Sequence, residues 1–216
     1  MKRKTPSEYS ARCDLALAYR LLDKYGLNEG IDNHLTMRIS VPRPAGSSEE
    51  LNENGEVYRY LVNAYGMKWS QVSATNLLLL DEGGLICEGN EGLEPDPTAF
   101  CIHSAIHKAK GEEGKVVFHT HQTAVATLCC LETDEGRLQP LLMCHQNSLR
   151  YYGQISYLEE FNGLVLDANE GEKIVSSLGD KVRASLISFS SPLHKKFIVG
   201  VPFLPRSNNK NSHFFL

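Results

Sequence analysis

The chain has 216 residues, 42% of them hydrophobic, which suits one domain with a substantial core. Its net charge is −4 with no basic block, so we expect no nucleic-acid partner. No apolar stretch reaches the length of a membrane span, and residues 1–8 lack the apolar core of a secretory signal. These features predict a cytoplasmic protein without a membrane span.

Helices and strands alternate along the chain. Residues 5–8, Thr-Pro-Ser-Glu, have the form of a helix start, and the helix is predicted to end near Lys24 before Gly26. The apolar stripe of this helix is Tyr9, Cys13, Leu17 and Leu21. Alternating apolar and polar residues then predict strands at 33–40 and 58–63, separated by a polar surface loop at 42–55.

The middle of the chain predicts a hairpin followed by a helix. Leucines 77–80, the turn Asp-Glu-Gly-Gly and residues 85–87 are typical of a hairpin, although the four leucines could instead be helical. Asp96 is predicted to cap a helix that runs to about Lys110. Further along we predict a strand at 115–118, a helix at 122–130, strands at 155–158 and 163–167, and a helix at 168–178.

The cysteines are scattered without a Cys-x-x-Cys pair, and most lie in apolar periodic segments. This distribution favours reduced core cysteines over a disulfide framework or a zinc knuckle. The six positions are Cys13, Cys87, Cys101, Cys129, Cys130 and Cys144.

The segment His119-Thr120-His121 directly follows the predicted strand at 115–118. Residues i and i+2 of an extended backbone point to the same side, so both imidazoles leave the strand end together. Two imidazoles supply half of a tetrahedral site for Zn²⁺ or a similar cation. The alternative is a pair of partly buried histidines hydrogen-bonded to the backbone.

Five motifs occur in the order of one known family. The motifs are RCDLALAYRLLD from Arg12, NHLTMR from Asn33, AFCIHSAIH from Ala99, VFHTH from Val117 and QNSLRYYG from Gln146. Over about residues 7–181 the chain therefore resembles the class II aldolase/adducin N-terminal domain family. The resemblance implies a three-layer α/β/α fold around a mixed, mostly antiparallel sheet, here with its C-terminal part truncated. Enzymes of this family cleave or epimerise sugar phosphates with a histidine-bound divalent metal, whereas adducins act in the actin-associated membrane skeleton.

The resemblance implies that His119 and His121 are two metal ligands, for Zn²⁺ or a similar divalent cation. The family's third histidine, expected just after residues 179–181, is missing from this chain. His194 and His213 follow in the tail but lack the family's setting, so we assign neither of them as a ligand.

The family's aldolase acid/base position, four residues before His103, is occupied by Ala99. Glu94 lies five residues further back, where we expect a solvated loop residue. Of the paired His103 and His107, we expect the first to be buried and hydrogen-bonded and the second to be partly exposed, with a metal pair as the alternative. The resemblance also implies weaker substrate-binding positions at Asn33, His34, Gly66, Thr98 and His145.

Residues 182–216 match nothing in the family pattern. The codons of Lys181-Val182-Arg183 can spell a eukaryotic splice donor, which suggests that 182–216 is translated intron; the alternative is a genuine divergent C-terminus.

The sequence predicts a class II aldolase/adducin-type domain with a partial metal site and impaired sugar-phosphate lyase chemistry. The alternative is a non-enzymatic, adducin-like module of the actin cytoskeleton. The expected partners are a small phosphorylated sugar-like ligand or a cytoskeletal protein such as actin, with homo-oligomers common among the family's enzymes.

Overall fold

The computed structural model describes residues 6–89, 91–129, 131, 133–134, 140–158, 168–181, 184–187 and 197–200. The helices of this part of the chain are α1 (Pro6–Lys24), the short 3-10 helix η1 (Trp69–Gln71), α2 (Pro97–Lys110), α3 (Thr123–Leu128), α4 (Gln146–Leu149) and α5 (Ala168–Leu178). The strands are β1 (His34–Pro42), β2 (Glu56–Val62), β3 (Leu78–Leu80), β4 (Ile86–Glu88), β5 (Val116–His119), β6 (Ile155–Leu158), β7 (Ala184–Ile187) and β8 (Phe197–Gly200).

The described strands form one sheet in the order β4-β3-β2-β1-β5-β8-β7-β6. Neighbouring strands are antiparallel except for β6 and β7, which run parallel, so the predicted mixed, mostly antiparallel sheet is confirmed. Strands β7 and β8 lie in the segment after residue 181, where no element was predicted. They join β6 to the rest of the sheet.

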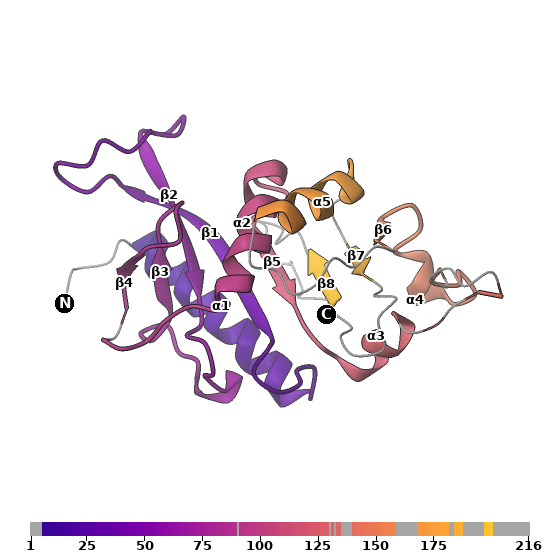
Figure 1. Ribbon diagram of the computed structural model, residues 1–216. Coiled ribbons are helices and arrows are strands. Elements are labelled where there is room, and N and C mark those ends of the chain that lie inside the picture. The colour runs from indigo at the N-terminus through magenta and orange to yellow at the C-terminus, as the bar shows by residue number, and fades with distance from the viewer. Residues whose placement is uncertain are drawn as a thin grey trace.

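Helices cover the two faces of the sheet, which confirms the predicted three layers (Figure 1). On one face, α1 packs its Leu15 and Tyr19 against Leu35 and other alternate residues of β1. On the opposite face, α2 and α5 pack side by side and bury Ile106 and Ile174 over β5. Among the described residues, no helix combines the length and the apolar character that crossing a bilayer requires.

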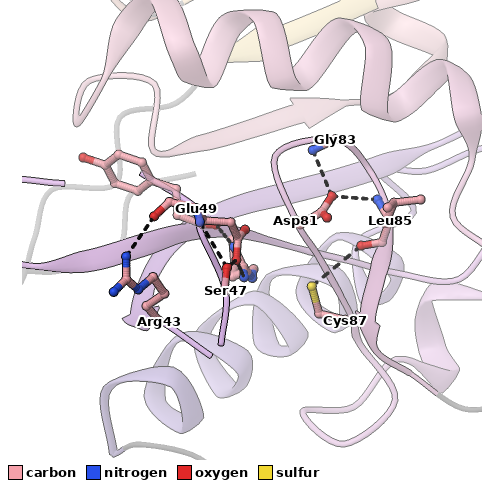
Figure 2. Close-up of polar contacts among 9 residues, drawn as sticks. Arg43, Ser47, Glu49, Asp81, Gly83, Leu85 and Cys87 are labelled. Carbon is pink, nitrogen blue, oxygen red and sulfur yellow. Dashed lines mark hydrogen bonds and ion pairs between the residues drawn. The ribbon is translucent and has the colours of Figure 1, made fainter. Parts of the chain in front are cut away.

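The predicted bounds of most elements hold, including the hairpin of β3 and β4, α5 and β6. In the hairpin turn, the Asp81 carboxylate accepts hydrogen bonds from the backbone N–H groups of Gly83 and Leu85, both at 2.8 Å (Figure 2). Gly84 has φ 86°, and a Cβ there would lie 2.8 Å from the Phe100 ring, so the turn requires glycine. The strand predicted at 163–167 lies outside the described residues.

The predicted apolar stripe of α1 does not face the core. Tyr9 is 56% exposed and Leu17 is 47% exposed, whereas Arg12 is fully buried. The Arg12 guanidinium donates to the Glu8 carboxylate at 2.8 Å and to the Leu77 carbonyl at 2.8 Å, which offsets the cost of burying it. The pattern was misleading because α1 has a second apolar stripe, Leu15, Tyr19 and Leu22, which faces the sheet beside the buried Arg12 and Glu8.

The expectation of core cysteines was wrong for two of them. Cys129 is buried, but Cys87 is exposed on the edge strand β4, and Cys144 is exposed in the segment before α4.

The predicted surface loop between β1 and β2 is attached to the sheet by one carboxylate. Both oxygens of Glu49 accept hydrogen bonds from the Arg59 guanidinium of β2 at 2.8 Å. Ser47 also donates to Glu49 at 2.7 Å, and Arg43 donates to its backbone carbonyl (Figure 2). Hydrogen bonding from Arg59 lowers the pKa of the Glu49 carboxyl. The bidentate geometry fixes the path of the loop.

Candidate functional site

The register between β1 and β5 places His34 directly opposite His119. Opposite residues of paired strands point to the same face of a sheet, and here that face is covered by α2. The two rings stack with their centroids 4.5 Å apart and 13° between their planes. Both side chains are buried, at 3% and 2% exposed.

The His119 and His121 rings converge, as the His-x-His spacing predicted. Their Nε2 atoms are 2.9 Å apart, and the planes of the rings are 75° from each other. The Asn33 side chain holds the second histidine in place, because its Oδ1 accepts a hydrogen bond from the His121 backbone N–H at 2.7 Å. His121 is half-buried, so the pair runs from the protein interior toward the surface.

Two more histidines, His103 and His107, continue the line of His121, His119 and His34 beneath α2. These five residues are called the histidine row. The His103 ring centroid lies 4.6 Å from that of His34. Thr36 of β1 contacts both histidines of the helix: its Oγ1 is 2.7 Å from His103 Nδ1 and 2.7 Å from His107 Nε2. The two histidines are on one face of α2 because they are four residues apart. The row therefore connects α2, β1 and β5.

His103 is buried and hydrogen-bonded as expected, but the prediction that His107 is partly exposed was wrong. Its side chain is fully buried, stacked on the Tyr60 ring at 5.1 Å between centroids, and its Nδ1 is 2.5 Å from the Gly114 carbonyl oxygen. Burial lowers the pKa of His107 to about 3, assisted by the charge of Arg38 and opposed by the bond to Gly114. Burial likewise lowers the pKa of His103 well below its ordinary value. Both rings are therefore neutral at pH 7.

A small cavity lies beneath α2 at the end of this row where His103 and His107 are found. Its volume is about 10 Å³. The lining residues come from α2 and the two residues before it, and from β1, β2 and β3; the polar residues among them are Thr36, Tyr60, Asp96, His103, Ser104 and His107.

The remaining predicted positions are spread over the fold. Ala99 is buried against the cavity, and no titratable group occupies its place in α2. Glu94 is exposed, as expected, and its carbonyl accepts from the Tyr65 N–H. Thr98 is engaged in the helix cap, where its N–H and hydroxyl both donate to Asp96.

Gly66 and His145 both lie in exposed segments. Gly66 occupies a turn with φ 75°. The His145 ring caps α4 by accepting from the Asn147 N–H at 3.1 Å. His145 Nδ1 therefore already has a hydrogen-bond partner within α4, and this exposed ring is not part of the histidine row.

The row supplies nitrogen donors for a cation but does not complete a metal site. Two nitrogens that are each about 2.1 Å from one cation lie roughly 3–3.4 Å apart, which is near the observed separation in the His119 and His121 pair. Within the described part of the chain, no group of three His, Cys, Asp or Glu side chains is arranged to hold a metal. The tail histidines His194 and His213 lie outside the described residues.

The sequence analysis did not find Thr36 or Tyr60. Thr36 lies two residues after His34 in β1, and Tyr60 pairs with Arg38 in β2, so alternation places both side chains on the same face of the sheet as His34. The available signal was the run of polar residues at His34, Thr36 and Arg38, all buried under α2. Alternation alone cannot distinguish a polar face in solvent from one covered by a helix.

Comparison with known proteins agrees with this architecture. The family model of the class II aldolase and adducin N-terminal domain matches residues 13–188. An adducin-related protein of Schizosaccharomyces pombe is 29% identical over 182 residues, covering 82% of this chain and 49% of that protein. A putative aldolase class 2 protein of Caulobacter vibrioides is 31% identical over 176 residues, covering 81% of this chain and 59% of that protein.

A solved structure shares the fold over most of the chain. The aldolase II superfamily protein from Pseudomonas syringae superimposes with a TM-score of 0.73 at 29% identity, covering 92% of this chain and 68% of that one. The chain spans about half to three fifths of the length of the two relatives above. Fold, motif order and sequence similarity agree, and the protein belongs to the class II aldolase and adducin N-terminal domain family.

Proposed function

We propose that this domain carries a partial divalent-metal site formed by His119 and His121, with impaired sugar-phosphate lyase chemistry. The observation that carries the proposal is the 2.9 Å separation of the two Nε2 atoms at the C-terminal end of β5. Neutral imidazoles are good ligands for Zn²⁺ and similar cations. A cation bound there would supply Lewis-acid stabilisation of an enediolate.

The residues of the chain itself position this pair. Asn33 fixes the backbone of His121, and the stacked His34 ring restricts the orientation of His119. Such support matters because the partners of a ligand set its orientation and its affinity for metal. With two nitrogen donors instead of three, we expect binding weaker than that of a complete site.

The position that the resemblance assigns to proton transfer holds no titratable group. A general acid or base must lie within hydrogen-bond reach of the proton it handles, and Ala99 has no such group. Glu94 is exposed outside the helix, so it does not replace that group. We therefore expect little cleavage of sugar phosphates.

A small phosphorylated sugar-like compound remains the proposed ligand class, and its contacts would be weak. Of the proposed binding positions, Asn33, Thr98 and His145 already bond within the protein, and His34 is buried. The backbone near Gly66 is the most accessible of the proposed contacts. Backbone amides can still bind phosphate without hydroxyl side chains.

Zinc titration by calorimetry on chelator-treated protein tests the metal site. We expect about one equivalent of Zn²⁺ to bind the wild type and the binding to be lost in the His119→Ala, His121→Ala double variant. His145→Ala is the matched control, because this exposed histidine lies outside the row. Equal zinc binding by the wild type and a folded double variant would exclude these two ligands.

The second proposed function is a non-enzymatic, adducin-like interaction with the actin cytoskeleton. Two observations favour it: the buried alanine at the acid/base position, and the similarity to a protein named as adducin-related. Co-sedimentation with actin filaments tests it, and a folded sample that does not pellet above background contradicts it.

Both proposed functions imply a cytoplasmic protein. Sedimentation velocity of the purified protein would show whether it forms homo-oligomers.

We also retain residues 7–181 as the proposed extent of the domain and 182–216 as a divergent tail of intron or genuine origin. The family-model match runs past this boundary to residue 188, and strands β7 and β8 of the sheet also lie beyond residue 181, which favours a genuine C-terminus at least as far as these strands. Sequencing spliced transcript across codons 178–190 separates the two origins, because an uninterrupted frame together with a tail peptide in the purified protein excludes a translated intron.

A further inference from the structure

The turn that leads from the 42–55 loop into β2 is organised by one asparagine. The Asn52 side-chain oxygen Oδ1 accepts hydrogen bonds from the backbone N–H groups of Asn54 at 2.9 Å and Glu56 at 3.1 Å. The Asn52 Nδ2 donates to the Ser40 hydroxyl at 3.1 Å, and the Asn52 backbone N–H donates to the Glu56 carbonyl at 2.8 Å. Both ends of the Asn52 side chain are therefore engaged, as is usual for an asparagine that builds a turn.

Asn54, at the tip of the same turn, has no such role. Its side chain is exposed, and within the part of the chain that the structure describes the Asn54 side-chain amide forms no hydrogen bond. The next residue, Gly55, is also exposed, and its φ of 74° is one that glycine adopts readily. A Cβ at Gly55 would meet no atom within 4 Å, so the space around this residue is open. The Gly55 N–H donates to the Asn52 backbone carbonyl at 3.0 Å.

An exposed asparagine followed by glycine carries its own nucleophile and electrophile. The backbone nitrogen of Gly55 attacks the side-chain carbonyl carbon Cγ of Asn54, and a new C–N bond forms as the nitrogen loses its proton to hydroxide. The C–N bond of the side-chain amide then breaks, and ammonia leaves with a proton taken from water. Water opens the resulting cyclic imide at either carbonyl carbon, which gives aspartate or isoaspartate. Each conversion consumes one water molecule and releases one ammonia, and glycine favours it because no Cβ obstructs the nitrogen.

Sequence and hydrogen bonding together single out this asparagine. Among the described residues, Asn54 is the one asparagine that precedes a glycine. Opening the Gly55 N–H bond to the Asn52 carbonyl frees the nucleophile, while the bonds between Asn52 and Glu56 keep the turn closed. The chain has another Asn-Gly pair at residues 162–163, which lies outside the described residues.

We propose that Asn54 is a site of spontaneous deamidation, at which the folded protein accumulates aspartate and isoaspartate. Aspartate places a further carboxylate between Glu53 and Glu56 in the sequence. Isoaspartate adds a methylene group to the main chain, which displaces the Glu56 N–H from Asn52 Oδ1. The conversion therefore weakens the turn at the start of β2.

Peptide mapping by mass spectrometry tests the site on the full-length wild type, incubated at pH 8 and sampled over several weeks. We expect the peptide that contains residues 54–55 to convert progressively from the amide to the acid, with the isoaspartate and aspartate products separated by chromatography. The same chain unfolded in urea is the reference, and its conversion should be faster because no Gly55 N–H bond has to open. Folded protein in which Asn54 stays intact while the unfolded chain is converted would overturn the proposal.

Isoelectric focusing of the folded protein gives a second readout. A species one charge more negative than the starting net charge of −4 should grow faster in the wild type than in Asn54→Gln, whose longer side chain cyclises less readily. Gly55→Ala should also slow it, because the added methyl group obstructs the nitrogen. Asn147→Gln is the matched control, since Asn147 is exposed but precedes a serine, and its rate should equal that of the wild type. Equal rates in the wild type and Asn54→Gln would contradict the assignment, and the peptide map of the wild type requires no variant to fold.

Discussion

Asn33 and His121 are 88 residues apart in sequence, and the Asn33 Oδ1 accepts a hydrogen bond from the His121 backbone N–H at 2.7 Å. The Asn33 side-chain amide also donates to the Glu29 backbone carbonyl, and the Asn33 backbone carbonyl accepts from Trp69 Nε1 at 3.2 Å. One buried asparagine thus connects the loop before β1, the η1 segment and the end of β5. The position of the His-x-His segment depends on this asparagine.

Replacing this asparagine should destabilise the protein. Asn33→Ala leaves the His121 N–H without its acceptor, and we expect the free energy of unfolding to fall by about 1–3 kcal/mol. Urea unfolding at pH 7 measures the change. Asn54→Ala is the matched control, since Asn54 is exposed, and its effect should stay within about 0.5 kcal/mol. Equal effects of the two variants would contradict the connecting role of Asn33.

Tyr19→Phe should also be destabilising, because the fully buried hydroxyl connects α1 to two strands. It accepts from the Leu35 N–H at 2.8 Å and lies 2.7 Å from Asn63 Oδ1. Removing it leaves buried groups without partners, at a cost of about 1–3 kcal/mol. Thermal and urea unfolding should show this loss for Tyr19→Phe and almost none for Tyr25→Phe, in which the ring is 61% exposed. A Tyr19→Phe variant as stable as the wild type would show that these bonds contribute little.

Arg12→Met should reveal the contribution of a buried cation. The guanidinium is fully buried and donates to Glu8, to the Leu77 carbonyl and to Glu88. Losing it leaves the Leu77 carbonyl unpaired and Glu8 without its cation, so we expect a loss of about 2–4 kcal/mol. Arg20→Met, at an exposed position of the same helix, is the control for helix propensity. A gain in stability in Arg12→Met would mean that apolar packing outweighs the three bonds.

Acid should destabilise the protein through His107. Its pKa is about 3 in the folded state and near 6.5 when unfolded, so between these values the unfolded chain binds more protons. Stability is therefore full above about pH 6.5 and falls as the pH drops toward 3, by about 2 kcal/mol at pH 5 for this one histidine. Urea midpoints at pH 7, 6 and 5 measure the slope.

His107→Gln should flatten this pH dependence, while His103, whose pKa is also lowered by burial, contributes the remaining slope. His145→Gln, at an exposed position, is the matched control substitution. An identical slope in wild type and His107→Gln would show that His107 does not remain neutral in the folded protein.

The fold was predictable where local pattern and tertiary environment agree. Alternation in β1, the hairpin turn at Asp81 and the cap at Asp96 each depend on a few neighbouring residues, and each was confirmed. The inner face of α1 was predicted wrongly because the helix has two apolar stripes, and the fully buried Arg12 next to the inner one is typical of a surface residue until its partners are known. Strands β7 and β8 were missed because each has four residues in a segment without a recognised motif.

The site was predictable only in part for a similar reason. The spacing of His119 and His121 is local, so the sequence alone indicates that their rings converge. The stacking of His34 on His119 depends on the register of β1 and β5, and the contact of His103 with Thr36 depends on where α2 packs. Neither register nor packing can be inferred from one sequence.

The last strand of the described chain lies in the interior of the sheet, where β8 separates β5 from β7. Residue 197 follows residue 119 by 78 positions, so at typical translation rates β5 is made about 4–16 s before its partner. During synthesis the backbone of the histidine-bearing strand has an open side that can pair with other nascent chains. Protection by a chaperone over this interval should therefore raise the yield of native protein more than protection after release.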